Sequence, residues 1–208
     1  MNHVALLGDS IFDNRVYVAP APDVGEQLRS QLGRDWTVSL VAVDGHVASD
    51  VRDRQIARVP DGTSHIVISV GGNDALGRAS ILNESARSVA EAVGRLAEAQ
   101  ARFAQSYGAM IDAVLTLGLP TAVCTIYDAN YPEPHRRLVV SALSLFNDAI
   151  MRVAFARGLD VVDLRLICDD PADYANPIEP SARGGEKIAK AIADLVRSGR
   201  ADRSSIWT

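Results

Sequence analysis

The sequence predicts an α/β fold in which a parallel sheet is covered by helices on both faces. Five short apolar runs alternate along the chain with longer helical segments. Each run is largely apolar instead of alternating with polar residues, which is typical of parallel strands buried on both faces. The 208 residues are 48% hydrophobic and 23% charged, close to the average of a globular domain. Alternation of strands and helices implies crossover connections and therefore a parallel sheet.

The predicted strands end at small or polar residues, which suit the turn into the following helix. They cover residues 3–7, 37–43, 65–70, 121–126 and 159–164.

The predicted helices carry start and stop signals. Gly33 is a plausible C′ glycine of the first helix, Gly118 and Pro120 stop the third, and Ser181 is a candidate N-cap of the last. The helices cover residues 23–32, 47–58, 85–117, 136–157 and 181–196. We expect a single domain over residues 1–208 with a loose tail at 199–208, although Ile206 and Trp207 could dock.

Charge and hydropathy restrict the partners and the location of the protein. The formal net charge of −5 and the isoelectric point of about 5.3 argue against nucleic acid or an anionic membrane surface, since both attract basic faces. The most apolar stretch, residues 109–127, is broken by Asp112, Gly118 and Pro120, so we expect no membrane span. The first residues lack the features of a signal peptide, which makes the cytoplasm the expected location. The oligomeric state stays open.

The cysteines do not predict a metal site or a disulfide framework. Cys124 and Cys168 lie 44 residues apart, without a CxxC motif or a neighbouring histidine. We expect two buried thiols and no cofactor.

Polar residues gather where the first three predicted strands end. Ligands of open parallel α/β sheets bind beyond the carboxyl ends of the strands, so these residues should face one crevice. The set consists of Asp9, Ser10, Asp13, Asn14, Asp44, Gly45, His46, Gly72, Asn73 and Asp74.

Three of these residues suit nucleophilic catalysis. Ser10 follows a tight turn and can project its hydroxyl into the crevice, while the Gly45 N–H and the Asn73 amide are suitable donors to a developing oxyanion. Each residue taken alone is equally compatible with a turn or a helix N-cap. Their joint spacing at successive strand ends is far more specific.

At these positions the chain resembles the SGNH (GDSL) hydrolases, specifically an uncharacterised bacterial branch. Gly8-Asp9-Ser10 resembles the first block of the family, Gly45 the second, and Gly72-Asn73-Asp74 the third. The resemblance covers nearly the whole chain and implies a three-layer α/β/α, flavodoxin-like sandwich with a five-stranded parallel sheet. It also implies ester hydrolysis by Ser10, with the N–H groups of Ser10 and Gly45 and the side chain of Asn73 as oxyanion donors.

The fourth block departs from the family pattern. Asn176-Pro177-Ile178-Glu179 stands where the family has Asp-x-x-His, and no histidine follows His135. A free glutamate has a pKa of about 4.3, below the optimum of a general base, but burial or nearby carboxylates would raise it. Three interpretations remain for Glu179: the base that replaces histidine, a ligand-binding group in a non-hydrolytic pocket, or a structural group at the last helix.

The histidines offer further candidates. His46 follows Gly45 and could lie near Ser10, and His135 lies on a proline-rich loop that could overhang the pocket. Asp9, Asp74 and His46 are therefore predicted substrate-binding residues beside the oxyanion donors. His3 and His65 begin strands at the opposite edge of the sheet and are expected to be structural.

Three functions follow, in order of preference. The first is a serine esterase that acts on an ester of a small metabolite or sugar, with Ser10 as nucleophile, Glu179 as base and Asn176 orienting it or bonding nearby backbone. The second is a degenerate hydrolase-fold protein that binds a small ligand. The third is a Mg²⁺-dependent phosphate-handling protein, since the carboxylates at positions 9, 13, 44 and 74 could hold the ion. Residues after the fourth strand, including Tyr127 and Tyr131, could line the pocket.

Overall fold

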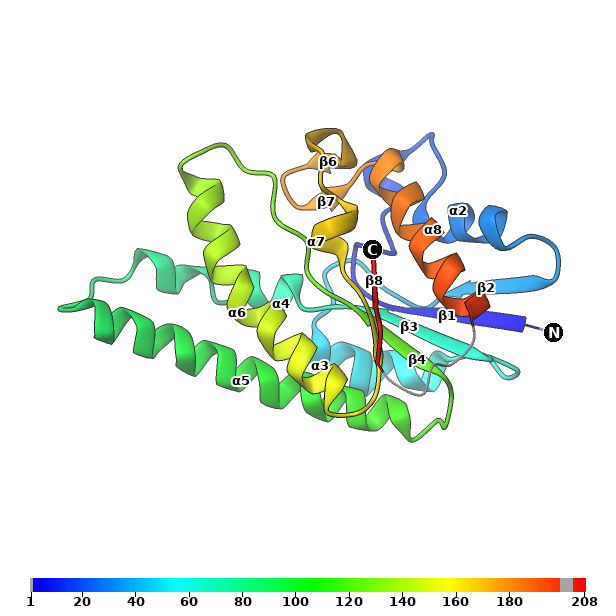
Figure 1. The fold of residues 1–208 in the computed structure, drawn as a ribbon, viewed down its shortest axis with the longest axis horizontal. Coiled ribbons are helices and arrows are strands. Elements are labelled where there is room, and N and C mark those ends of the chain that lie inside the picture. Colours follow the sequence, from blue (N-terminus) through cyan, green and yellow to red (C-terminus); the bar gives the residue numbers. More distant parts are fainter. Residues whose placement is uncertain (1, 199–203) are drawn as a thin grey trace.

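A six-stranded parallel sheet with helices on both faces forms the framework of the protein (Figure 1). The computed structural model describes residues 2–198 and 204–208. The strands lie in the order β2-β1-β3-β4-β5-β8, and every neighbouring pair is parallel. This confirms the predicted α/β sandwich. The strands are β1 (Asn2–Gly8), β2 (Trp36–Leu40), β3 (His65–Ser69), β4 (Thr121–Cys124), β5 (Asp160–Val162) and β8 (Ile206–Trp207).

The sixth strand, β8, corrects the prediction of five. Ile206 pairs with Val161 and Trp207 with Val162, so the end of the predicted loose tail is part of the sheet. Residues 199–203 lie outside the described residues. Without β8, β5 would be an edge strand with unpaired N–H and C=O groups. Pairing satisfies these groups, and Trp207 also packs against the core. A two-residue apolar run is too short to be predicted as a strand.

The helices begin and end close to their predicted limits, with one exception. The predicted helix 47–58 is a succession of three helix types: α3 (Ala48–Asp50), the π-helix η1 (Val51–Gln55) and the 3₁₀ helix η2 (Ile56–Arg58). The other helical elements are α1 (Arg15–Val18), α2 (Val24–Leu32), α4 (Gly72–Leu76), η3 (Ala79–Asn83), α5 (Val89–Leu115), α6 (His135–Phe155), α7 (Leu164–Ile167), η4 (Pro171–Asp173) and α8 (Ala182–Ser198). A separate antiparallel pair, β6 (Tyr174–Asn176) and β7 (Glu179–Pro180), precedes α8.

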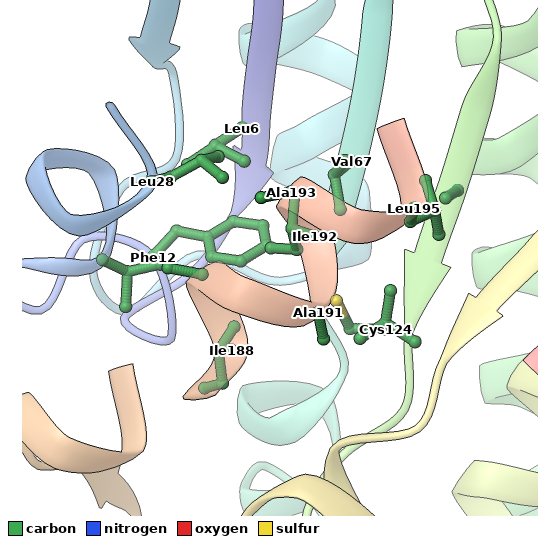
Figure 2. Packing of buried hydrophobic residues seen from close by; sticks show 14 of the residues in the cluster. Leu6, Phe12, Leu28, Val67, Cys124, Ile188, Ala191, Ile192, Ala193 and Leu195 are labelled. Carbon is green, nitrogen blue, oxygen red and sulfur yellow. The ribbon is translucent and has the colours of Figure 1, made fainter. Parts of the chain in front are cut away.

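Each face of the sheet carries its own hydrophobic core. Successive side chains of a strand point to opposite faces, so Val4 and Leu6 of β1 pack in one cluster and Ala5 and Leu7 in the other. The first cluster joins the sheet to α2 and α8, as Figure 2 shows for Leu6 beside the α8 residues. The second cluster joins the sheet to α5 and α6. The two cores hold the strand ends in fixed positions.

The N-terminal ends of α5 and α6 project past the sheet (Figure 1). Phe146 and Ile150, in the second half of α6, are buried against the core, whereas Leu138 near its start is 47% exposed. Among the residues that the structure describes, α6 is the one helix long and apolar enough to cross a membrane by composition. Core helices of soluble proteins have the same composition. The buried apolar residues in the second half of α6 pack in the same cluster as α5 and the sheet.

The ends of β1 and β3 approach each other closely. Gly8 has a φ of 133°, and a Cβ at this position would lie 1.8 Å from the Ser69 carbonyl oxygen, so only glycine fits. The Asp9 N–H donates to the same carbonyl at 3.0 Å. This contact fixes the turn that carries Ser10 against the end of β3.

Candidate active site

A cavity of about 270 Å³ lies beyond the carboxyl ends of the central strands. Its lining contains four polar residues that the sequence predicted to share a crevice: Asp9, Ser10, Asn73 and Glu179. Gly45, His46, Asp74 and Asn176 are not among the lining residues. The structure therefore brings together in one cavity the predicted nucleophile Ser10, the predicted oxyanion donor Asn73, and Glu179, which stands in place of the family histidine.

Ser10 and Glu179 are in direct contact. The Ser10 hydroxyl donates a hydrogen bond to Glu179 Oε1, with an Oγ–Oε1 distance of 3.0 Å. Both residues are buried, with relative exposures of 6% and 5%. A general base must lie within about 2.6–3.2 Å of the heavy atom whose proton it accepts. The glutamate thus stands in the geometric relation to the serine that a general base requires.

Burial changes the proton affinity of Glu179. Loss of solvent raises the pKa of this carboxyl to about 7; the Ser10 hydrogen bond opposes the shift and the negative charge of Asp44 adds to it. A pKa near the working pH gives a base that is ionised in part of the molecules and still accepts a proton readily. The second oxygen, Oε2, is buried and has no hydrogen-bond partner among the described residues.

Asp9, the residue before the nucleophile, is also buried, with 3% exposure. Burial raises the pKa of its carboxyl to about 8; the N–H of Ile11 opposes the shift, and the charges of Glu179, Asp74 and Asp44 add to it. Asp9 Oδ1 accepts the Ile11 N–H at 3.2 Å. The site therefore contains two carboxyls, Asp9 and Glu179, whose pKa values are both raised by burial.

The hairpin of β6 and β7 carries Glu179 to Ser10. Asn176 turns this hairpin, since its Oδ1 accepts the Ile178 N–H at 2.9 Å, and no hydrogen bond joins its amide to Glu179 within the described residues. Of the two predicted uses of Asn176, the structure shows the bond to nearby backbone. Tyr127 supports the same turn by donating from its hydroxyl to the Ile178 carbonyl at 2.6 Å.

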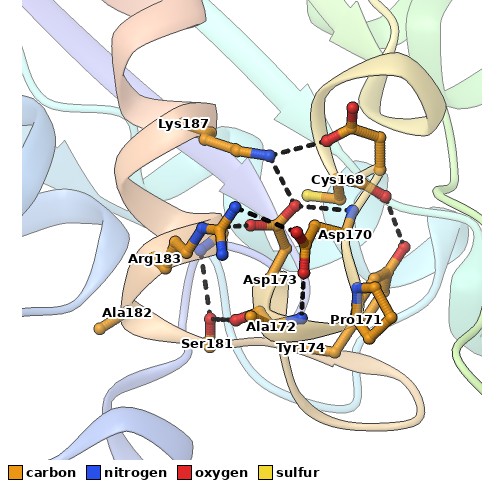
Figure 3. Close-up of polar contacts among 12 residues, drawn as sticks. Cys168, Asp170, Pro171, Ala172, Asp173, Tyr174, Ser181, Ala182, Arg183 and Lys187 are labelled. Carbon is orange, nitrogen blue, oxygen red and sulfur yellow. Dashed lines mark hydrogen bonds and ion pairs between the residues drawn. The ribbon is translucent and has the colours of Figure 1, made fainter.

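Ionic contacts with α8 anchor the start of the hairpin (Figure 3). Asp173 is fully buried, and Lys187 Nζ lies 2.7 Å from its Oδ2. Arg183 Nε lies 3.3 Å from the other oxygen, and the Ser181 N–H donates to the Asp173 carbonyl at 2.8 Å. A buried charge is stable only when it is paired, so this network holds the hairpin to α8.

The predicted oxyanion donors are arranged around the end of β1. Asn73 Nδ2 donates one hydrogen to the His46 carbonyl at 3.0 Å, which leaves its second N–H free for a ligand in the cavity. Gly45 has a φ of 82°, and its N–H has no acceptor in the part of the chain that the structure describes. The bond from Asn73 to His46 joins the Gly45 loop to the cavity wall.

The remaining sequence candidates fall into two groups. His135 and the tyrosines at positions 127 and 131 line the cavity, as the sequence suggested. His46 and Asp74 do not line the cavity: His46 Nδ1 lies 2.9 Å from Gln55 Nε2, and Asp74 Oδ2 accepts the Ala48 N–H at 3.0 Å. Gln55 had no role in the sequence interpretation.

The acidic residues proposed as Mg²⁺ ligands bond to the protein instead. No group of three or more side chains able to hold a metal ion occurs among residues 2–198 and 204–208. Asp13 Oδ2 accepts the Asp44 N–H at 3.0 Å, and Asp44 Oδ2 accepts the Tyr17 hydroxyl at 2.7 Å. This arrangement does not favour the phosphate-handling alternative.

One side of the cavity wall is mainly apolar, which the sequence did not predict, although Arg78, Asn83 and His135 also line the cavity. Helical periodicity showed that the residues of the apolar side were apolar but not that they face a cavity. They come from α4, η3 and the projecting ends of α5 and α6: Leu76, Ile81, Leu82, Leu96, Leu138, Val139, Ala142 and Leu143.

Comparisons with known proteins agree with this architecture. Residues 6–187 match the model of the GDSL-like lipase/acylhydrolase family. Similar solved structures include a lipase from a goat rumen metagenome, with 17% identity and a TM-score of 0.70 over 97% of this chain and 99% of that one. An aryl esterase from M. smegmatis has 15% identity and a TM-score of 0.67, covering 95% of this chain and 99% of its own. A carbohydrate acetylesterase from Sinorhizobium meliloti has 13% identity and a TM-score of 0.66, with the same coverage.

A search of curated protein sequences gives no match. The structural neighbours share the fold, and the family model spans most of the chain. The three-layer sandwich, the order of the motifs and the matched range lead to one conclusion: the chain belongs to the GDSL-like lipase/acylhydrolase family.

Proposed function

We propose that this protein hydrolyses carboxylic esters with a serine–glutamate pair, in which Ser10 is the nucleophile and Glu179 the base. The observation that carries the proposal is the 3.0 Å hydrogen bond between Ser10 Oγ and Glu179 Oε1, made between two buried side chains that line the cavity. The raised pKa of Glu179, about 7, supports the role of a base near neutral pH.

The proposed reaction has two stages. Ser10 Oγ attacks the carbonyl carbon while Glu179 Oε1 accepts the hydroxyl proton, and the resulting oxyanion accepts hydrogen bonds from the N–H groups of Ser10 and Gly45 and from Asn73 Nδ2. Glu179 then gives its proton to the leaving alkoxide, and an acyl-serine remains. Water attacks this ester, Glu179 accepts the water proton, and the same proton returns to Ser10 Oγ as the acid leaves.

The apolar wall favours an ester with an apolar acyl or alcohol group. At about 25 cal/mol per Å² of apolar surface, such a group gains binding free energy from leucine and valine side chains. Sugar hydroxyls placed against the leucine and valine side chains would lack partners there, at a cost in binding free energy, whereas Arg78, Asn83 and His135 elsewhere in the lining offer polar partners. We therefore propose an ester with an apolar acyl chain, and the small metabolite or sugar expected from the sequence stays a prediction. The cytoplasmic location stays a prediction.

A panel of p-nitrophenyl esters of increasing acyl length tests the proposal. Ser10→Ala should reduce turnover to the background rate, and Glu179→Gln, which keeps the side-chain volume, should lower kcat about 10²- to 10⁴-fold. The matched control is Glu186→Gln, on the exposed face of α8, which should retain the wild-type kcat. Unchanged kcat in Glu179→Gln would show that another group is the base.

The second candidate function is ligand binding without turnover. It is favoured by one observation: Glu179 Oε2 is buried and has no hydrogen-bond partner in the described part of the chain, as expected of an acceptor for a ligand donor. If the catalytic machinery has degenerated, the wild type will be inactive and the double variant Glu179→His/Asn176→Asp should gain Ser10-dependent activity. If the glutamate is a working base, the same variant should not exceed the wild type.

A further inference from the structure

Gln55 is a buried polar residue that the proposed reaction does not use. Its side chain has no exposure to solvent, and it ends the π-helix η1, Val51–Gln55. Turns of π-helix are rare in proteins and occur frequently at functional sites. Gln55 is not among the residues that line the cavity, so any effect of Gln55 on the reaction is transmitted through the residues that it contacts.

The amide of Gln55 makes three hydrogen bonds to two loops of the site. Its Oε1 accepts the Gly8 N–H at 2.8 Å, and its Nε2 donates to the Gly8 carbonyl at 2.7 Å. The other hydrogen of Nε2 points to His46 Nδ1 at 2.9 Å, so that nitrogen is the acceptor and the imidazole proton lies on Nε2. One side chain thus joins the end of β1 to the loop after β2.

These bonds continue to the oxyanion donors. Gly8 lies two residues before Ser10, and His46 directly follows Gly45. The His46 carbonyl accepts the Asn73 amide at 3.0 Å. Gln55 is therefore hydrogen-bonded to Gly8 and to the His46 side chain, and the backbone carbonyl of His46 is hydrogen-bonded to Asn73. These bonds connect the turn that carries Ser10 to Asn73.

We propose that Gln55 is a positioning residue that fixes the three donors of the oxyanion hole relative to one another, with His46 as the relay. The proposal rests on the proposed ester hydrolysis. The donors sit on three separate segments: the turn after β1, the loop after β2 and the start of α4 after β3. An oxyanion hole requires each donor within about 0.5 Å of its productive place. Gln55 and His46 supply buried or half-buried side-chain bonds between these segments, and Asp13 and Asp74 supply further bonds to the backbone of Asp44 and Ala48.

The expected consequence is specific to the transition state. A donor displaced by about 1 Å costs on the order of 100-fold in rate, because the bond to the oxyanion is lost while the ground state still binds. Loss of Gln55 should therefore lower kcat and leave KM nearly unchanged. A purely structural glutamine would lower the fraction of folded protein without changing kcat per active site.

The experiment compares Gln55→Met, Gln55→Glu, His46→Ala and the double variant Gln55→Met/His46→Ala on a p-nitrophenyl ester. The rate is divided by the concentration of active sites, which is measured by titration with a p-nitrophenyl phosphonate that phosphonylates Ser10. The matched control is Gln27→Met, since Gln27 is also a nearly buried glutamine whose Nε2 donates to a backbone carbonyl, that of Ala182 at 2.7 Å, but it does not line the cavity.

We expect kcat to fall roughly 30- to 100-fold in both Gln55 variants and about tenfold in His46→Ala, with KM within about twofold. Because Gln55 and His46 act in one chain, the double variant should be no slower than Gln55→Met. Gln27→Met should lose stability but retain its kcat. If Gln55→Met does not fold, Gln55→Glu and the half-buried position His46 still decide the question.

The outcomes separate the two proposals. A wild type without Ser10-dependent turnover overturns the proposed function, and the positioning role with it. A wild type with turnover and Gln55 variants at the wild-type kcat overturns the positioning role alone. So does a raised KM with unchanged kcat, an equal fall of kcat in Gln27→Met, or independent effects of Gln55 and His46.

Discussion

The cavity has two walls that are built in different ways. On the sheet side, Ser10 and Glu179 are more than nine-tenths buried, and hydrogen bonds of defined geometry hold them. On the helix side, the wall is made mainly of leucine, isoleucine and valine side chains, several of them from the ends of α5 and α6 that project past the sheet. Leu76 and Leu138 in this wall are 45% and 47% exposed.

This difference separates the reaction from the choice of substrate. Hydrogen bonds are directional, so the sheet side fixes the reacting atoms, and a change there should alter kcat. Apolar contacts are non-directional and scale with area, so the helix side should set which acyl chains fit. The projecting ends of α5 and α6 are outside the two cores, so substitutions there should cost little stability.

The pH dependence of the reaction tests the sheet side and has the largest expected effect. The ordinary pKa of a glutamate is 4.5, and burial raises that of Glu179 to about 7. Since only the ionised form accepts the serine proton, activity is present above pH 7 and lost as the pH falls through 7. We expect kcat/KM to decrease about tenfold per pH unit, to about 1% of its plateau at pH 5.

The temperature dependence of that profile identifies the group. Ionisation of a carboxyl has little heat, whereas ionisation of an imidazole has a large one, so the apparent pKa of a glutamate base should stay nearly constant between two temperatures. A strong shift of the apparent pKa with temperature would indicate a histidine and contradict the assignment of Glu179.

Filling the apolar wall tests the helix side. Ala142→Trp places an indole in the cavity from the half-buried face of α6. At about 0.8 kcal/mol per buried CH₂, excluding a few methylenes should lower kcat/KM for an octanoyl ester roughly 30-fold, with the acetyl ester nearly unchanged. The control is Ala97→Trp on the exposed face of α5. An equal loss for both esters would show that α6 affects the reacting centre and not the fit of the chain.

The two walls were unequally predictable from the sequence. Ser10, Asn73 and Glu179 could be brought together because carboxyl ends of parallel strands meet at one edge and because the spacing of the motifs fits one family. The apolar wall could not be predicted, since leucines of an amphipathic helix have the same spacing in the sequence whether they face a core or a cavity. Gln55 was missed for a different reason: its bonds depend on a π-helical turn that no periodicity in the sequence reveals.

The ion pair between Lys187 and Asp173 holds to α8 the hairpin that carries Glu179. Its removal has the smallest expected effect on the reaction. Lys187 pairs with the fully buried Asp173, whereas Lys190, one turn further along α8, is exposed and lies 3.6 Å from Asp194. Lys187→Met leaves the buried carboxylate with Arg183 and the Asp170 N–H, and should reduce the free energy of unfolding by about 2 kcal/mol, measured in urea. Lys190→Met should change it by less than about 0.5 kcal/mol.

The same pair of variants shows whether the anchor reaches the chemistry. Glu179 lies six residues after Asp173 on the hairpin, so a looser hairpin should lower the share of molecules with the Ser10–Glu179 bond formed. We expect kcat of Lys187→Met to fall about fivefold while KM and the preference for acyl length stay constant. If stability falls but kcat does not, the bonds of Tyr127 and Asn176 suffice to place the base, because they act on the hairpin closer to Glu179 than Lys187 does.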